Sequence, residues 1–526
     1  MPWDEQLLFV DPGLATLEGT GLGKGVEIMM SETKKLPAAG RIRSAMRRAW
    51  NRGGTLPAAL AICVLSLLFA SGASATQREV GSGQTYTTIQ ACINAAGSGD
   101  ICNVHAGTYS ESVSFKTSGV TLQVNSGDTV VVNGTIDILS NANSIVDGFQ
   151  VTGFSVTSNG GIHASGTTGG IIRNNVVHDA TGSGIYVRQS TNFQVYGNTV
   201  HDMNGPCCIS DGDGIVIYSA SSTDSSYAHG VRVYNNEVYQ NHQDGIEISG
   251  SYESIYNNYV HDNIYSNFAN THPDGIECNN NVDGITECPH TLIYNNTVKN
   301  QNQNIYIDGL GSASADNDIW IFNNVVYNDP TSSTGVSMAT GSSSEVILNV
   351  GQNAHILNNT IGGVAQYFGL CLGDCTGGGN TSWAFTNVTV ENNIFEGSLY
   401  YAFWAFPASS VTASNYNDYY NNSQLINWGG TGYSSLSSFA SATGQEANGI
   451  SSNPLLAAFP TPTLQSGSPA GAAGANLTSL GQASLNSDKN GTARPASGAW
   501  AMGAYASGSA APAAPNPPTN VKATAQ

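Results

Sequence analysis

A short pattern of hydrophobic and polar positions recurs eight times along the middle of this chain. In each copy, a hydrophobic residue and an outward-facing residue are followed by Asn-Asn or Gly-Asn. The second Asn returns after 22 to 38 residues, at Asn175, Asn198, Asn236, Asn258, Asn296, Asn324, Asn359 and Asn393. This period is typical of a solenoid, in which a coil buries its apolar face only by stacking on its neighbours.

Short β-branched stretches flank each Asn pair. Period-two alternation places residues such as Ile172, before the pair, and Val177, after it, in the interior. A second signal, Gly-Ile, follows later in the coil, as at Gly184-Ile185 and Gly245-Ile246, and indicates another strand. We therefore predict two strand positions per coil and an all-β fold, a right-handed parallel β-helix solenoid. Its handedness follows from the rule for parallel crossovers.

The two ends of the predicted solenoid carry different patterns. Residues 86–96 have apolar residues at helical spacing, which predicts an N-terminal capping helix. Strands are expected from Ile101 to about Phe406, followed by an irregular C-terminal wrap, in one domain spanning 76–505. Residues 506–526 are interpreted as an Ala/Pro linker and the start of a truncated immunoglobulin-like or fibronectin-like module.

An apolar stretch near the start of the chain, residues 58–75, follows several arginines and ends in Ala-Ser-Ala. These features predict a cleaved secretory signal peptide within a leader of residues 1–75. A membrane anchor is the alternative, but the stretch is short for one. We therefore expect a secreted or cell-surface monomer with no membrane association after cleavage.

The charge balance narrows the choice of partners. The chain has 17 Lys and Arg against 37 Asp and Glu, a formal net charge of −20. Nucleic acid is therefore excluded as an expected partner, and an acidic polysaccharide would need a bridging cation. Eight cysteines after the leader fall into close pairs, which favours disulfides over zinc: Cys92 with Cys102, Cys207 with Cys208, Cys278 with Cys288, and Cys371 with Cys375. The adjacent Cys207 and Cys208 would either bridge each other or each pair elsewhere.

Three stretches carry a family resemblance. Residues 88–112 (TIQACINAAGSGDICNVHAGTYSES) resemble the opening of secreted right-handed β-helix proteins of the pectate-lyase-like superfamily. Residues 453–474 and 494–505 resemble the ending that these proteins share. The resemblance implies the fold over most of 76–505. It does not select a reaction, because the superfamily includes polysaccharide lyases, glycoside hydrolases, uronate epimerases and non-catalytic surface proteins.

Stacking the Gly-Ile signals in register gathers acidic residues on one face, since equivalent positions on adjacent coils lie about 4.8 Å apart. An Asp precedes three of the glycines, and a His lies two positions before two of these Asp residues. The predicted catalytic residues are Asp213, Asp244, Asp274, His242 and His272. Neighbouring carboxylates suit general acid and base roles in glycoside hydrolysis. The alternative is that these Asp residues only form turns.

Calcium is a second interpretation of the same face. The possible Ca²⁺ ligands, all hard oxygen donors, are Glu247, Glu277, Asn279 and Asp308. Such an ion would assist a lyase or a uronate epimerase acting on an acidic polysaccharide. A lyase also needs a base, for which the sequence offers Arg188, Arg232 and Lys299.

Outward aromatic residues complete the predicted site. The predicted substrate-binding residues are Tyr186, Tyr218, Tyr234, Tyr256, Tyr306 and Arg188. Tyr234 and Tyr256 belong to a longer aromatic row that alternatively only stabilises the stacked coils. Together these features predict a carbohydrate-active protein that cleaves or remodels a polysaccharide, by carboxylate-based hydrolysis first. A Ca²⁺-dependent lyase or epimerase, and a non-catalytic glycan-binding or adhesive protein, are the alternatives.

Overall fold

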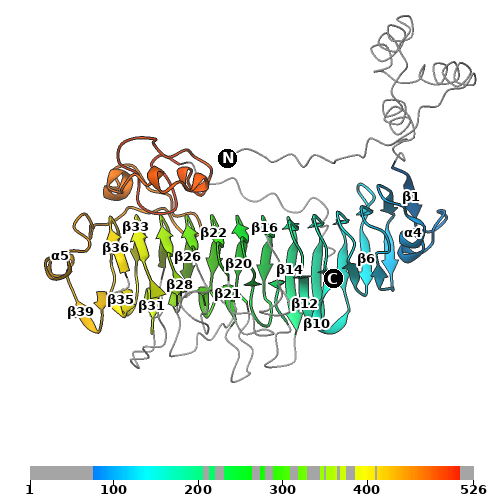
Figure 1. Cartoon of the computed structure of the whole chain (residues 1–526), viewed down its shortest axis with the longest axis horizontal. Helices are drawn as coiled ribbons and strands as arrows, with labels where there is room; N and C mark the ends of the chain where they lie inside the picture. The colour runs from blue at the N-terminus through cyan, green and yellow to red at the C-terminus, as the bar shows by residue number, and fades with distance from the viewer. Residues whose placement is uncertain are drawn as a thin grey trace, which may run out of the picture. The chain divides into compact units, whose positions relative to one another are not determined.

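The computed structural model describes residues 75–204, 212–218, 230–263, 273–278, 288–307, 318–328, 344–348, 351–363, 368–374, 385–408 and 411–509. The predicted leader, except Ala75, and the predicted module within 510–526 lie outside the described residues. In the described part, short parallel strands stack coil upon coil (Figure 1). The predicted β-helix architecture is confirmed.

Each full coil contributes three strands, so the predicted number of two was wrong. Sheet 1 has 13 strands, all parallel. In spatial order they are β1 (Gln77–Val80), β2 (Ile101–Val104), β5 (Thr121–Val124), β8 (Ile145–Asp147), β11 (Ile171–Arg173), β13 (Gln194–Tyr196), β16 (Arg232–Tyr234), β19 (Ser254–Tyr256), β22 (Leu292–Tyr294), β25 (Trp320–Phe322), β29 (His355–Leu357), β33 (Val388–Glu391) and β36 (Val411–Asn415).

Sheet 2 follows sheet 1 in every full coil. Its parallel strands are β3 (Gly107–Tyr109), β6 (Val130–Asn133), β9 (Gln150–Thr152), the first part of β12 (Val176–Arg188), β14 (Thr199–Asn204), β17 (Glu237–Tyr239), β20 (Tyr259–His261), β23 (Thr297–Lys299), β26 (Val325–Asn328), β30 (Thr360–Gly363), β34 (Ile394–Glu396) and β37 (Asp418–Tyr420).

Sheet 3 completes the coil and is joined to sheet 2 where β12 runs through the corner. Its strands are β4 (Val113–Ser114), β7 (Ile136–Leu139), β10 (Ser155–Ser165), the second part of β12, β15 (Ile215–Tyr218), β18 (Ile246–Ser249), β21 (Asp274–Cys278), β24 (Gln303–Ile307), β27 (Ser344–Leu348), β31 (Phe368–Gly373), β35 (Tyr401–Phe406), β38 (Gln424–Trp428) and the antiparallel β39 (Thr431–Tyr433). A short pair, β28 (Gly351–Gln352) with β32 (Phe385–Thr386), lies apart from these sheets.

The Asn pairs explain the third strand. The first Asn of a pair adopts the left-handed conformation, with φ of 55° at Asn235, 56° at Asn257 and 57° at Asn295. Asn tolerates this region better than most residues do, so the chain turns sharply there. The stretch expected to be one strand is therefore divided at the Asn pair into a strand of sheet 1 and a strand of sheet 2.

The second Asn of each pair faces the interior and joins a continuous chain of hydrogen bonds, which we call the Asn ladder. The backbone N–H and the Nδ2 of Asn258 both donate to Oδ1 of Asn296, each at 3.0 Å. The Nδ2 of Asn258 also donates to the carbonyl oxygen of Val233 at 2.9 Å. The ladder comprises Asn175, Asn198, Asn236, Asn258, Asn296, Asn324, Asn359, Asn393 and Asn417, each at most 2% exposed.

The interior of the coils is apolar, as the alternation predicted. Ile172, Val195, Val233 and Val177 are all fully buried. The glycines of the Gly-Ile signal are required by this packing. A Cβ on Gly245 would lie 2.3 Å from Val260 Cγ1 and 2.7 Å from the carbonyl oxygen of the next glycine in the row, so a larger residue does not fit.

The N-terminal end matches the prediction. The helix α4 (Ile89–Ala95) packs against the first strands, and its Thr88 cap accepts a hydrogen bond from the Ala91 N–H at 3.2 Å. The Cys92–Cys102 disulfide ties this helix to β2. The Cys278–Cys288 disulfide is also confirmed. Cys371 is disulfide-bonded, while its predicted partner Cys375 and the pair Cys207 and Cys208 lie outside the described residues.

The C-terminal end differs from the prediction. The coils continue past Phe406, because β36, β37 and β38 form one more turn before α5 (Leu436–Thr443). The sequence pattern missed this turn because Tyr416, with a φ of 57°, takes the place of the first Asn. Asn417 nevertheless extends the Asn ladder.

The C-terminal wrap, residues 450–509, contains only short 3-10 helices: η3 (Pro469–Ala472), η4 (Thr478–Leu480) and η5 (Ala483–Asn486). It binds to side chains at the corner between sheets 1 and 2. Asn323 Nδ2 donates to the Ser487 carbonyl oxygen at 2.8 Å, and Asn392 Oδ1 accepts from the Ala475 N–H at 2.8 Å. The left-handed Asn residues therefore both turn the chain and hold the wrap.

The Asn ladder predicts that substitutions at two adjacent asparagines, Asn257 and Asn258, differ greatly in their effect on the free energy of unfolding. Asn258→Ala removes the acceptor of the Asn236 N–H and Nδ2 groups and leaves them buried. We expect a loss of about 2–5 kcal/mol in the free energy of unfolding, since each buried unsatisfied group costs about 1–3 kcal/mol. Asn257→Gly is the matched control, because Asn257 is exposed and left-handed. Urea titration measures both, and equal losses would contradict the ladder's role.

Glu253 is an acidic side chain that lies among the apolar residues of the interior. Glu253 is fully buried, at a position occupied by Val231 and Thr291 on the neighbouring coils. Burial raises the pKa of Glu253 well above its ordinary value, against a smaller opposing effect of the Val231 backbone. The folded state therefore holds this carboxyl group in its protonated, neutral form more strongly than the unfolded chain does.

Glu253 predicts a pH dependence of stability. Its contribution is fully present below the unfolded pKa of about 4.3 and is lost as the pH rises through the higher folded pKa, at about 1.4 kcal/mol per unit of pKa difference. Glu253→Gln cannot ionise, so its melting temperature should match the parent at acidic pH and exceed it at alkaline pH. Thermal melts from pH 4 to 9 test this, and parallel curves would rule it out.

Candidate active site on sheet 3

Two rows of outward-facing side chains run along sheet 3. The register of the parallel strands places equivalent residues of successive coils next to each other in each row. One row contains Asp213, Asp244, Asp274 and Gln303. The other contains His163, Tyr186, Val216, Glu247, Glu277 and Tyr306. The predicted acidic face therefore forms on β15, β18 and β21 and the residues just before them.

Five acidic residues from three consecutive coils form what we call the carboxylate cluster: Asp213, Asp244, Asp274, Glu247 and Glu277. None is more than 8% exposed. Oxygen atoms of Asp213, Asp244 and Glu247 lie within 4.8 Å of one another, and those of Asp244, Asp274 and Glu277 do the same. Asp244 belongs to both groups and is the centre of the cluster.

Hydrogen bonds to the backbone fix the Asp side chains. The Asp244 N–H donates to Asp213 Oδ1 at 3.2 Å, and the Asp274 N–H donates to Asp244 Oδ1 at 2.6 Å. Gln303, with its amide nitrogen turned toward Asp274, donates to both carboxylate oxygens at 2.8 and 2.9 Å. The Asp side chains thus satisfy backbone N–H groups, which is the turn-forming role given above as the alternative to catalysis. This role does not prevent them from also taking part in a reaction.

Glu277 differs from its neighbours in its protonation. Burial raises the pKa of Glu277 well above its ordinary value, and the charges of Asp244 and Asp274 raise it further. The folded state therefore favours the protonated form of Glu277 more strongly than that of an exposed glutamate would be favoured. A carboxyl group held neutral among other acidic groups is one way in which a site separates an acid from a base. His242, 9% exposed, has its pKa lowered by burial, which favours the neutral imidazole.

The remaining predicted residues divide between faces. Tyr186, Tyr306 and Arg188 lie on sheet 3 with the carboxylate cluster. Tyr186 is 2% exposed and meets the His163 ring edge to face at 5.5 Å. The backbone of Tyr218 pairs with Arg188 in the same sheet. The other three predicted residues, His272, Asn279 and Asp308, lie outside the described residues.

Tyr234 and Tyr256 lie on sheet 1, so the structure does not bring them to the carboxylate cluster. Their rings stack at 4.8 Å, and the row continues to Tyr196 at 4.7 Å and to Tyr294 at 4.9 Å. Both faces of these two rings are covered by neighbouring rings. Only ring edges remain for a ligand, which favours the coil-stabilising role over sugar stacking.

The three cationic residues that the sequence offers as a lyase base lie on three different sheets. Arg188 is on sheet 3, Arg232 is on sheet 1, and Lys299 is on sheet 2. Lys299 forms an ion pair with Asp262 at 3.5 Å. Of the three, only Arg188 shares the sheet of the carboxylate cluster.

An aromatic group on sheet 3 was missed by the sequence analysis. Phe368, Tyr401 and Trp404 pack together with Cys371, and Tyr306 packs against them beside the carboxylate cluster. Phe368 and Tyr401 follow the Asp row, and Trp404 follows the Glu row, in register. The alternation in Tyr401–Phe406 signals this strand, but no Gly-Ile pair precedes it, so it was not aligned with the acidic coils.

Comparison with known proteins identifies the fold. A family model described as "Right handed beta helix region" matches residues 91–227 and 136–282. The stacked parallel strands of the described residues agree with that description, so the chain has a right-handed parallel β-helix fold. No curated protein sequence matches significantly.

Several solved structures are similar in fold at low identity. Pectate lyase Pel9A is 14% identical, with 83% of this chain and 98% of that chain covered and a TM-score of 0.43. An alginate lyase from Paenibacillus sp. str. FPU-7 is 15% identical, covering 67% and 97%, with a TM-score of 0.35. PfbA, a surface adhesin of Streptococcus pneumoniae, is 13% identical, covering 65% and 85%, with a TM-score of 0.38.

Among the described residues, no helix is long and apolar enough to cross a membrane.

The carboxylate cluster predicts cation binding that depends on pH. An all-oxygen, buried donor set suits Ca²⁺. We expect millimolar Ca²⁺ to raise the melting temperature, and more so at higher pH, because binding must displace the Glu277 proton. Asp244→Asn should abolish the shift. Glu237→Gln, a half-exposed carboxylate on sheet 2, is the control and should keep it. An unchanged shift in Asp244→Asn would place the cation elsewhere.

Proposed function

We propose that this chain is a secreted carbohydrate-active β-helix protein that cleaves a polysaccharide at the carboxylate cluster by glycoside hydrolysis. One observation carries the proposal: Glu277, whose pKa is raised, lies with Asp244 and Asp274 in a group of oxygens within 4.8 Å of one another. An acid and a base held this closely are the minimum that glycoside hydrolysis requires.

The chemistry assigns one role to each kind of carboxyl group. Glu277, protonated, donates its proton to the glycosidic oxygen as the bond to the anomeric carbon breaks. Asp244 or Asp274, ionised, attacks that carbon and forms a covalent glycosyl intermediate, because separations of about 5–5.5 Å are typical of retaining enzymes. Glu277 then takes a proton from the water that releases the sugar, and the site returns to its starting state.

The surroundings of the cluster support a sugar chain as substrate. Tyr306, Phe368, Tyr401 and Trp404 give sheet 3 an aromatic surface next to the acidic residues. Aromatic surfaces beside a few fixed polar groups are typical of sugar-binding sites. Two described disulfides, together with the predicted signal peptide, support export to an oxidising compartment.

The two overlapping carboxylate groups favour a second candidate, a Ca²⁺-dependent lyase or epimerase acting on a uronate polymer. Asp213, Asp244, Asp274, Glu247 and Glu277 would hold the ion. When bound, the cation would neutralise a uronate carboxylate and acidify the proton beside it. Arg188 is then the cationic base candidate on the same sheet.

An assay of the full chain on a polysaccharide panel, with and without Ca²⁺, separates these functions. Hydrolysis should give new reducing ends without absorbance at 235 nm. Asp274→Asn should lower the rate by about 10²–10⁴-fold, since it removes a positioned carboxylate, whereas Glu237→Gln on sheet 2 should not. Activity should also fall as the pH rises through the Glu277 pKa, because the acid is then lost.

Other outcomes of this assay have definite meanings. Absorbance at 235 nm that requires Ca²⁺ would replace the hydrolase with the lyase. Inversion at C5 of a uronate by NMR, without cleavage, would indicate the epimerase. Binding without any reaction would contradict the enzyme proposal and leave a glycan-binding surface protein.

A further inference from the structure

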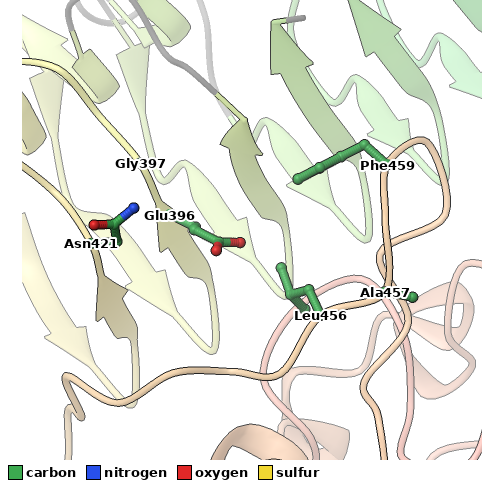
Figure 2. A pocket seen from close by; sticks show the side chains of 6 residues that line it. All are labelled: Glu396, Gly397, Asn421, Leu456, Ala457 and Phe459. Carbon is green, nitrogen blue, oxygen red and sulfur yellow. The ribbon is translucent and has the colours of Figure 1, made fainter.

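A pocket lies on sheet 2, away from the sheet that carries the carboxylate cluster. It has a volume of about 220 Å³ and is lined by Glu396, Gly397, Asn421, Leu456, Ala457 and Phe459. Figure 2 shows that two different segments build it, the strand end at Glu396 on one side and the loop with Phe459 on the other. The C-terminal wrap therefore closes over sheet 2 and leaves a hollow.

The two sides of the pocket have opposite chemistry. Glu396 is the last residue of β34, and Asn421 follows β37 on the next coil of sheet 2; they supply a carboxyl and an amide group. Leu456, Ala457 and Phe459 supply an apolar wall. The wall is firmly placed, because Phe459 stacks on Tyr327 at 4.6 Å and packs against Gly362.

The polar side has unused hydrogen-bonding capacity. Among the described residues, neither the Glu396 carboxylate nor the Asn421 amide has a hydrogen-bond or ion-pair partner, and Figure 2 shows the Glu396 carboxylate directed toward the apolar wall. Next to them, Asp418 is fully buried, and its Oδ2 has no hydrogen-bond partner, although Oδ1 accepts from the Ser452 N–H at 3.2 Å. Asn421 is exposed and Glu396 is half-exposed, so both groups are open to a ligand from solvent, while the buried Asp418 Oδ2 is a group of the kind that is rarely left unsatisfied.

We propose that this pocket binds one neutral sugar unit of a glycan, as a second binding site separate from the carboxylate cluster. A carboxyl and an amide group pair with adjacent sugar hydroxyls, and the apolar wall packs against the C–H face of the ring. The volume is below the roughly 300–1,000 Å³ of pockets for drug-sized ligands, so it suits a single ring.

Charge and donor chemistry exclude the two obvious competitors. A uronate would meet Glu396, with Asp418 close behind it, and no described cation lines the pocket to offset the repulsion. Ca²⁺ takes six to eight oxygen ligands, whereas half of this pocket is apolar side chains. Burial raises the pKa of Glu396, and burial together with the charge of Glu396 raises the pKa of Asp418 to about 7.

The test uses the full chain and saturation-transfer NMR with methyl glycosides of xylose, glucose, galactose and mannose, and with methyl galacturonoside. We expect at least one neutral glycoside to bind with millimolar affinity, as a single ring allows, and the uronoside not to bind at this pocket. Glu396→Ala should weaken binding by about tenfold. Ala457→Phe should abolish it by filling the hollow from a half-exposed position.

Two controls separate this site from the rest of the molecule. Glu391→Ala removes a carboxylate of the same coil on sheet 1 and should leave binding unchanged. Asp244→Asn combined with Asp274→Asn disables the carboxylate cluster, and neutral-sugar binding should persist in that variant. Failure of the proposed hydrolysis would therefore not affect this result. The proposal is overturned if no neutral glycoside binds, if Ala457→Phe still binds, or if binding disappears with the carboxylate cluster.

Discussion

The Asn ladder is the interaction on which the rest of this structure depends. An amide side chain both donates and accepts, so each Asn satisfies the backbone N–H of its neighbour and passes the pattern to the next coil. The ladder ends at Glu446, which is almost fully buried and accepts from Asn417 Nδ2 at 2.6 Å and from Tyr419 OH at 2.8 Å. A carboxyl group suits this end because it only accepts hydrogen bonds. The last amide of the ladder needs an acceptor, and no further coil of the described chain follows that would need a donor.

The Asn ladder keeps successive coils in register, and this register aligns the residues of the carboxylate cluster. Because Asn198, Asn236 and Asn258 are aligned, Asp213, Asp244 and Asp274 on the same three coils are aligned too. The Asp row copies the backbone-to-side-chain bond of the Asn ladder, but a carboxylate has no N–H to pass on. The row therefore gathers buried carboxyl groups until Gln303 donates to its last member. Amides would serve better in a row that only turned the chain, so the presence of acids there favours a chemical role.

The sequence predicted whatever depends on local pattern. The solenoid, the interior residues, the capping helix and the Cys92–Cys102 and Cys278–Cys288 bonds all follow from spacing, and so does the alignment of Asp244 with Asp274. The third strand was missed because hydropathy does not show that an Asn turns the backbone. The pocket at Glu396 and Phe459 was not predictable, since its two sides are 63 residues apart and meet only through tertiary packing. Tyr234 was grouped with the site because the sequence pattern shows that a residue points outward but does not show on which of the three sheets it lies.

Few Lys and Arg side chains are available to bind a substrate, and this affects which kind of polysaccharide the protein would accept. Among the described residues, Arg78 pairs with Asp100, Arg173 with Asp147, and Lys299 with Asp262. Two more cations hold the C-terminal wrap: Arg494 donates to Asn323 Oδ1, and Lys489 donates to the Asn295 carbonyl oxygen. These five serve the fold and are not placed to bind an anionic polymer. A uronate substrate would then rely on Arg188 or on a bound cation, whereas a neutral glycan needs neither, and this difference favours the hydrolase over the lyase or epimerase.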